Sequence, residues 1–164
     1  KLYFIIIFLL ISIIFINKLL FFVILFSALD LIVSYLDTKH IDLCQDFFLY
    51  GIIIFSYSSH LKYIIPLIIL FLVNRLLLGK LSNRHFIKIP IIVIIACLAK
   101  LLNFWNLSYL GVFLFLFRYI LEYLLEFILT GKITFKRIPK RVLHLIGAYL
   151  FFSFFGGDII VFFS

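Results

Sequence analysis

The chain has 164 residues, of which 66% are hydrophobic and only 13% are charged. A soluble domain of this size has about 45–50% apolar and about 25% charged residues, so this chain has too few polar side chains to cover a surface in water. Its formal net charge of +8 would suggest a nucleic-acid partner in a soluble protein, but in a membrane protein such a charge comes from basic loops gathered on one side. The composition argues against a soluble domain and a nucleic-acid partner. It predicts an all-α, polytopic helical membrane protein in contact with lipids.

Two apolar runs at the N-terminus predict a helical hairpin. Lys1 precedes the first run, residues 2–16, and the turn at Asn17 and Lys18 leads to the second run, residues 19–36. The start resembles a signal peptide, but no small-residue cleavage site follows it. One continuous helix over both runs would be about 52 Å long, well beyond a bilayer, so the hairpin is preferred.

A third span is predicted over residues 41–59, on weaker grounds. Its uninterrupted apolar part covers only residues 47–55. A run this short is also typical of a re-entrant or interfacial segment.

The fourth and fifth spans are predicted over residues 63–79 and 89–103, on either side of a basic loop at residues 80–88. Arg75 lies near the end of the fourth span, where its long side chain is expected to extend towards the membrane surface. Pro90 lies at the expected beginning of the fifth span, where a missing amide is tolerated.

The sixth span is predicted over residues 107–129 and the seventh over residues 142–164, with a strongly basic loop at residues 130–141 between them. Trp105, the only tryptophan, directly precedes the sixth span, at the depth where aromatic residues gather at a membrane surface. No internal repeat or separate soluble segment is present, so residues 1–164 are predicted to form a single transmembrane domain.

The distribution of basic residues favours seven spans, although six are also possible. With seven spans, eleven of the fifteen basic residues fall on one side of the membrane, and only Lys18, Lys62 and Lys100 fall on the other. Basic loops collect on the cytoplasmic or matrix side, so the N-terminus is expected there. The eleven residues are Lys1, Lys39, Arg75, Lys80, Arg84, Lys88, Lys132, Lys136, Arg137, Lys140 and Arg141.

Three charged residues within the sixth span form the leading candidate site. Arg118, Glu122 and Glu126 are spaced four residues apart and so share one helix face. A lone charge at the centre of a bilayer costs at least about 2.5–3.5 kcal/mol, so this face should point into protein or a wet cavity. Carboxylates beside a cation suit a proton or ion path, but they equally suit mutual neutralisation or contacts with other subunits.

Two further acidic residues lie within predicted spans. Asp30 and Asp158 are candidates for the same proton path, and each is also explained by a polar contact between helices or by exposure to water. The Gly156-Gly157 pair before Asp158 is expected to allow a close helix contact or a break in the last helix.

The sequence offers little for a metal or a cofactor. Asp37, Asp42 and Asp46 have a spacing that could gather a divalent cation, but a wet acidic loop is the more economical interpretation. His144 lies in the seventh span without an evident histidine partner for haem. We therefore expect no cofactor, no metal site and no catalysis by the chain alone.

The residue usage points to an AT-rich genome. The sequence has no methionine and is rich in Phe, Ile, Leu, Tyr and Lys, which a mitochondrially encoded protein with an unusual start codon would explain. The leading hypothesis is an integral subunit of a respiratory-chain complex in the mitochondrial inner membrane, whose buried charges are structural and are also candidates for a proton path. The alternatives are a small oligomeric transporter or channel and a scaffold protein of a bacterial inner membrane.

Overall fold

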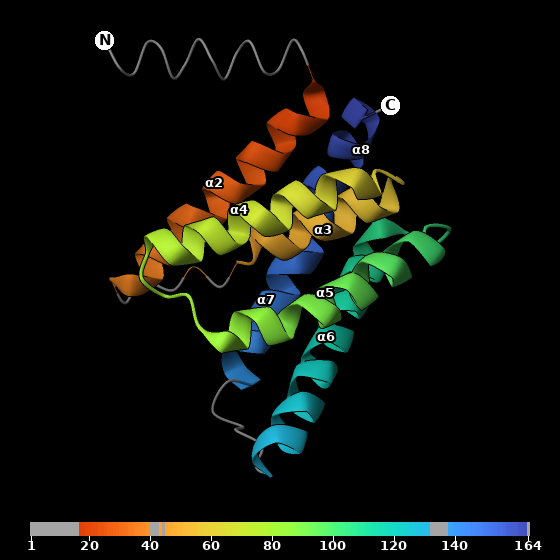
Figure 1. The fold of residues 1–164 in the computed structure, drawn as a ribbon. Helices are drawn as coiled ribbons and strands as arrows, with labels where there is room; N and C mark the ends of the chain where they lie inside the picture. The colour runs from red at the N-terminus through yellow and green to blue at the C-terminus, as the bar shows by residue number, and fades with distance from the viewer. Residues whose placement is uncertain (1–16, 40–42, 44, 132–137, 164) are drawn as a thin grey trace, which may run out of the picture.

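The computed structural model describes residues 17–39, 43, 45–131 and 138–163. Within these ranges 86% of the chain is helical and there is no strand, which confirms the all-α prediction. Figure 1 shows the helices as a bundle in which α6 and α7 run at a steep angle to α2, α3 and α4. The elements are α2 (Lys18–Thr38), α3 (Phe47–Tyr57), the 3₁₀ turn η1 (Leu61–Tyr63), α4 (Ile64–Leu77), α5 (Asn83–Leu101), α6 (Leu107–Thr130), α7 (Ile138–Phe151), the π-helical turn η3 (Phe152–Gly156) and α8 (Gly157–Phe163).

Two of the described helices are long and apolar enough to cross a membrane. They are α2 and the continuous segment Ile138–Phe163, which comprises α7, η3 and α8. This observation is weak support, because core helices of soluble proteins have the same length and composition. The seven-span arrangement is not confirmed, because only these two of the described helices qualify as candidate spans. The predicted span at residues 2–16 lies outside the described residues.

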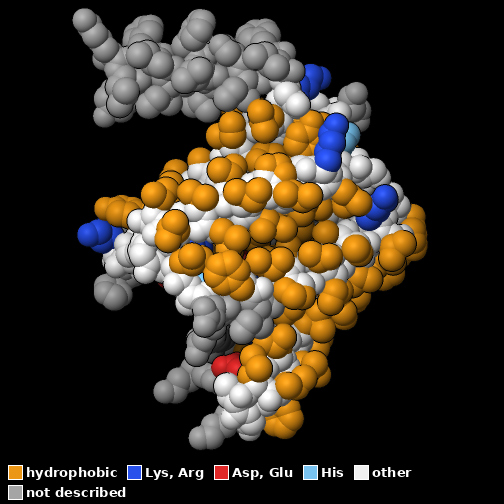
Figure 2. Space-filling view, in the orientation of Figure 1, with side chains coloured by type: hydrophobic (Ala, Val, Ile, Leu, Met, Phe, Trp, Pro, Cys, Tyr) orange, Lys and Arg blue, Asp and Glu red, His pale blue; other side chains and the backbone are white. Residues whose placement is uncertain are grey.

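The surface of the bundle carries many large hydrophobic side chains. In Figure 2 they cover most of the visible face, and lysine and arginine side chains lie mainly towards its margins. On α4, Ile65 and Leu77 are among the exposed side chains, and on α6, Tyr109 and Ile128 are as well. The outward faces of these helices are therefore apolar.

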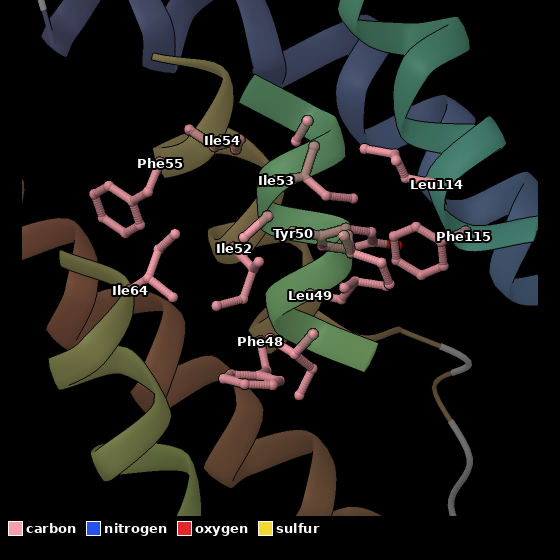
Figure 3. Close-up of a cluster of buried hydrophobic side chains, with 14 of the residues drawn as sticks. Phe48, Leu49, Tyr50, Ile52, Ile53, Ile54, Phe55, Ile64, Leu114 and Phe115 are labelled. Carbon is pink, nitrogen blue, oxygen red and sulfur yellow. The ribbon is translucent and has the colours of Figure 1, made fainter. Parts of the chain in front are cut away.

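The short helix α3 forms the centre of the hydrophobic core. It contacts α2, α4, α5 and α6, and each of its residues from Phe48 to Ser56 is buried. Figure 3 shows its side chains meeting Ile64 from α4 on one side and Phe115 from α6 on the other. The predicted span at residues 41–59 is thus wrong in extent, because the helix has only 11 residues, about 16 Å. It is also too deeply buried for an interfacial segment.

Contacts between helix ends show that the helices alternate in direction. Asn17, before α2, hydrogen-bonds Tyr63, before α4, and the Tyr57 hydroxyl at the end of α3 donates to the Trp105 carbonyl before α6. His60 contacts Phe163, which ends α8. We call this the aromatic end. At the opposite end, which we call the basic end, α2, α4 and α6 finish and α3, α5 and α7 begin.

The helix α5 begins earlier than predicted. It starts at Asn83 rather than at residue 89, because Ser82 and His85 cap its first turn, with a distance of 3.1 Å between the Ser82 nitrogen and His85 Nδ1. Two thirds of the predicted basic loop, residues 83–88, is therefore helical, and Lys88 belongs to α5. Pro90 consequently lies inside the helix rather than at its start. The prediction failed because it began the helix after the basic residues, although the serine before them is the residue that caps its start.

Two glycines let the last helical segment pack closely on α6. A Cβ atom at Gly111 of α6 would lie 2.1 Å from the ring of Phe152, and a Cβ atom at Gly156 would lie 2.6 Å from Leu107. Phe152 and Gly156 bound the π-helical turn η3. The expected close contact and irregular turn near the Gly156-Gly157 pair are therefore both present.

We predict that Gly111→Ala destabilises the fold by about 1–3 kcal/mol, because the fully buried Phe152 ring has no free space to move into. Unfolding in detergent micelles, followed by circular dichroism, would measure this loss. Gly157→Ala is the matched control, since a Cβ atom there has no neighbour within 4 Å and alanine favours a helix. Equal stability of the two variants would contradict the close contact.

Candidate functional site

Arg118 on α6 is held between two carboxylates. Its Nη1 atom lies 2.5 Å from Asp46 Oδ2, and its Nε atom donates to Glu122 Oε1 at 2.9 Å. The planar guanidinium presents donors in several directions, which lets one arginine serve both acids. Asp46 directly precedes α3, so Arg118 lies near the basic end of the bundle. The expectation that this charge points into protein and pairs with Glu122 agrees with these contacts.

Glu122 is surrounded by three cations from three helices. Besides Arg118, Arg141 of α7 donates from Nη2 to Glu122 Oε2 at 3.0 Å, and Lys88 Nζ of α5 lies 3.3 Å from Oε1. The side chains of Arg118, Glu122 and Arg141 are each only 10–12% exposed. We call Asp46, Lys88, Arg118, Glu122 and Arg141 the charge cluster. It joins α3, α5, α6 and α7 at the basic end.

Aromatic side chains enclose one flank of the charge cluster. The Arg141 guanidinium lies over the Tyr123 ring, 3.9 Å from its centroid, and also over Tyr119 at 4.7 Å. Its Nη1 atom donates to the Tyr119 carbonyl at 3.3 Å, and the Tyr119 hydroxyl lies 2.8 Å from His144 Nδ1. These contacts fix the orientation of Arg141 and shield its pairing with Glu122 from solvent.

Asp46 is both a helix cap and a counter-ion. It lies in the connection before α3, and its Oδ1 atom accepts a hydrogen bond from the Leu49 amide at 3.1 Å. Burial alone would raise the pKa of its carboxyl group, but the charge and hydrogen bond of Arg118, together with the Leu49 amide, hold that pKa below the ordinary value. Asp46 is therefore an anion at neutral pH.

A second polar system joins α2 to α4. Asn74 Nδ2 donates to the Ser27 carbonyl at 2.9 Å, and Arg75 Nη2 donates to Asp30 Oδ1 at 3.2 Å. Arg75 also hydrogen-bonds Ser34. The expectation that Arg75 extends towards the membrane surface is therefore wrong, because a buried carboxylate on α2 lies within its reach. We call this set of contacts the α2–α4 polar stripe.

The α2–α4 polar stripe ends in an ion-pair group around Asp37. Lys80 Nζ lies 3.2 Å from Asp37 Oδ2, and Lys140 Nζ of α7 lies 3.7 Å from Oδ1. These side chains are a third to a half exposed, so the pairs contribute at most about 1 kcal/mol each. They connect α2, α4 and α7 at the basic end.

The structure brings together only part of the predicted site. Arg118 and Glu122 pair as expected, and Glu126 follows one turn further along α6 with a half-buried side chain. Asp30 belongs to the α2–α4 polar stripe, and Asp158 is exposed in the first turn of α8. The five predicted residues therefore lie at three separate places.

The acidic loop has a different role from either interpretation of its sequence. Asp37 and Asp46 belong to separate ion-pair groups, and Asp46 is largely buried rather than wet. Asp42 lies outside the described residues. Among the residues that the structure describes, no three His, Cys, Asp or Glu side chains are placed to hold a metal ion.

The roles of Asp46, Lys88 and Arg141 were not recognised from the sequence. Asp46 carries a local signal, since an aspartate directly before an apolar run is a typical helix cap. Lys88 and Arg141 carry none, because each lies in a basic stretch and is separated from Glu122 by 34 and 19 residues. The polar face of α2 could also have been found from the sequence. Its serines and aspartates recur at helical spacing, at Ser27, Asp30, Ser34 and Asp37.

The ion pairs of the charge cluster suit a structural role, as a clamp that holds helix ends together. Two carboxylates meet three cations, and every carboxylate has a direct cationic partner. Removing a partner from such a group leaves a buried charge without compensation, which is strongly unfavourable. The arrangement therefore fixes the ends of four helices relative to one another.

No protein-family model, curated protein or solved structure matches this chain.

We predict strong coupling between Asp46 and Arg118. Arg118→Gln should cost about 3–5 kcal/mol of unfolding free energy, because it leaves Asp46 buried without its counter-ion. In the double variant with Asp46→Asn, part of this cost should disappear, with a coupling of about 1–3 kcal/mol. Denaturant unfolding in micelles measures all four proteins.

The exposed pair Asp37 and Lys80 provides the matched control for this cycle. Its coupling should stay below about 1 kcal/mol, because solvent screens both side chains. Additive effects at Asp46 and Arg118 would show that the two side chains do not interact.

The stability of the protein should depend on Asp46 at low pH. Because the pKa of Asp46 is lowered by folding, its contribution is fully present above the ordinary carboxyl pKa of about 4 and is lost as the pH falls through the lower pKa of the folded state. The stability difference between the wild type and Asp46→Asn should be constant from pH 7 to pH 5 and shrink below pH 4. A difference that grows on acidification would contradict the lowered pKa.

Proposed function

We propose that the chain is an integral membrane subunit of a multi-subunit, energy-transducing complex of the respiratory-chain type. In this proposal the described helices cross or lie within the bilayer, and residues 2–16 supply a further span. The basic end faces the matrix or the cytoplasm. The chain carries out no redox chemistry of its own.

The observation that carries the proposal is the separation of polar from apolar groups. The ion pairs among the described residues lie in the half of the bundle nearest the basic end, whereas the outward helix faces are apolar. In the most apolar part of Ile138–Phe163, only 17% of the residues are buried inside the protein, and in α2 only 33% are. In water such faces would aggregate, and in lipid they need no cover.

The aromatic end supports the same placement. Trp105 and Phe104 are exposed there, beside Tyr57, whose hydroxyl binds the Trp105 carbonyl. Tryptophan and tyrosine favour the boundary between headgroups and hydrocarbon. The bundle thus has a basic boundary and an aromatic one, at opposite ends of its helices.

The charge cluster is proposed as a structural clamp, and Glu126 and Glu122 remain candidates for a proton path. A clamp is favoured because Glu122 already faces three cations. Such internal contacts hold the ends of α5, α6 and α7 together without help from another protein.

Labelling of introduced cysteines tests the membrane placement. With both native cysteines, Cys44 and Cys97, replaced by serine, we expect an impermeant maleimide to label Lys80→Cys and Lys140→Cys from one side of sealed vesicles. Lys62→Cys and Lys100→Cys should be labelled only from the other side. Labelling of Lys80→Cys and Lys62→Cys from the same side, or recovery of the protein without detergent, would contradict the proposal.

Purification from native membranes tests the assembly. A complex subunit should copurify with other membrane subunits in fixed stoichiometry, whereas a transporter or channel would be recovered alone or with copies of itself. In an intact assembly, Glu122→Gln and Glu126→Gln then test the proton path. Loss of proton-coupled turnover with Glu126→Gln would support a path through Glu126, and unchanged turnover in both variants would restrict these residues to structure.

A further inference from the structure

An apolar groove of about 450 Å³ runs between α2 and the last helical segment. One wall is formed by α2, including Phe22 and Leu29, and the other by α7, η3 and α8, including Leu150 and Phe154. The volume is in the range of sites that bind small apolar ligands. Gln45 is the only uncharged polar side chain among the lining residues, and it lies at the end of the groove nearest the basic end.

The charges beyond this end of the groove are predominantly positive. Lys140 lies two helical turns before Gly147, which lines the groove, so both residues are on the same side of α7. Lys140 and Lys80 share the single carboxylate of Asp37, and Lys39 lies at the end of α2 next to them. Among the described residues at this end, three lysines and the one aspartate Asp37 leave an excess of positive charge where the groove approaches the proposed membrane surface.

We propose that this groove holds an acyl chain of an anionic phospholipid, whose phosphate lies beside Lys140 and Lys39. The groove offers an apolar surface along the direction of the helices, as an acyl chain requires. The positive charge lies only at its basic end, which fixes the orientation of the lipid, and basic residues next to a membrane surface attract anionic headgroups. This inference rests on the membrane placement proposed above.

Native mass spectrometry of the full-length chain tests the proposal. The protein is incubated with micelles that contain equal amounts of phosphatidylglycerol and phosphatidylcholine, and the retained lipids are counted. We expect preferential retention of phosphatidylglycerol. Lys140→Gln should lower this preference about fivefold, the effect of one basic residue near the surface. Lys62→Gln, at the aromatic end, should leave it unchanged.

A matched pair of exposed positions on α7 tests the groove itself. Leu150 and Val142 are both about half exposed, but only Leu150 lines the groove, and Val142 lies on a different side of the helix. Leu150→Trp should fill the groove and abolish retention of the lipid, and Val142→Trp should not. Circular dichroism of both variants verifies that they are folded.

Three outcomes would overturn the inference. They are equal retention of the two lipids by the wild type, equal effects of Lys140→Gln and Lys62→Gln, and retention of lipid by Leu150→Trp. If removal of residues 1–16 is needed before lipid binds, the groove belongs to that segment and the proposal also fails. Recovery of the protein without detergent would instead refute the membrane placement, so the two failures are distinguishable.

Discussion

The contact on which this bundle depends is the double ion pair of Arg118. An arginine in the middle of a long apolar helix needs compensation, because an isolated charge away from water is strongly unfavourable. Asp46 and Glu122 supply it at 2.5 and 2.9 Å. Asp46 also caps α3, so the residue that starts the central helix is the one that holds α6 in place. The position of α3 and the position of α6 are therefore set by one contact.

The remaining polar contacts extend this constraint around the basic end. Glu122 also pairs with Lys88 of α5 and Arg141 of α7. The α2–α4 polar stripe joins α2 to α4 through Asp30 and Arg75. Towards the aromatic end, the helices meet mainly through apolar and aromatic side chains, such as the stacked pair Phe55 and Phe163. The bundle is thus joined by directional contacts at one end and by close packing at the other. Under the proposed membrane placement, apolar packing lacks the driving force that it has in water, so the directional contacts carry more of the specificity.

The helices whose bounds were predicted correctly are those marked by local features of the sequence. The predicted bounds of α2 and α6 agree with the structure within two residues, because each is a long and largely apolar run preceded by an asparagine that caps it. Prediction of α3 failed in length, since the short apolar run was extended into a polar segment to reach the thickness of a membrane. Arg118 and Glu122 could be paired from their spacing, but the pairing of Arg118 with Asp46 joins residues 72 positions apart. No pattern within one helix contains such information.

The shortness of α3 has a consequence for how the chain is assembled. Eleven residues cannot bridge the hydrocarbon layer alone, and the polar backbone at both ends of so short a helix would be left facing lipid. In a bilayer α3 must therefore enter together with the helices that enclose it. Under the proposed membrane placement, biogenesis would proceed by the joint insertion of α3 with the helices that contact it, α2, α4, α5 and α6, rather than by one helix leaving the translocon at a time.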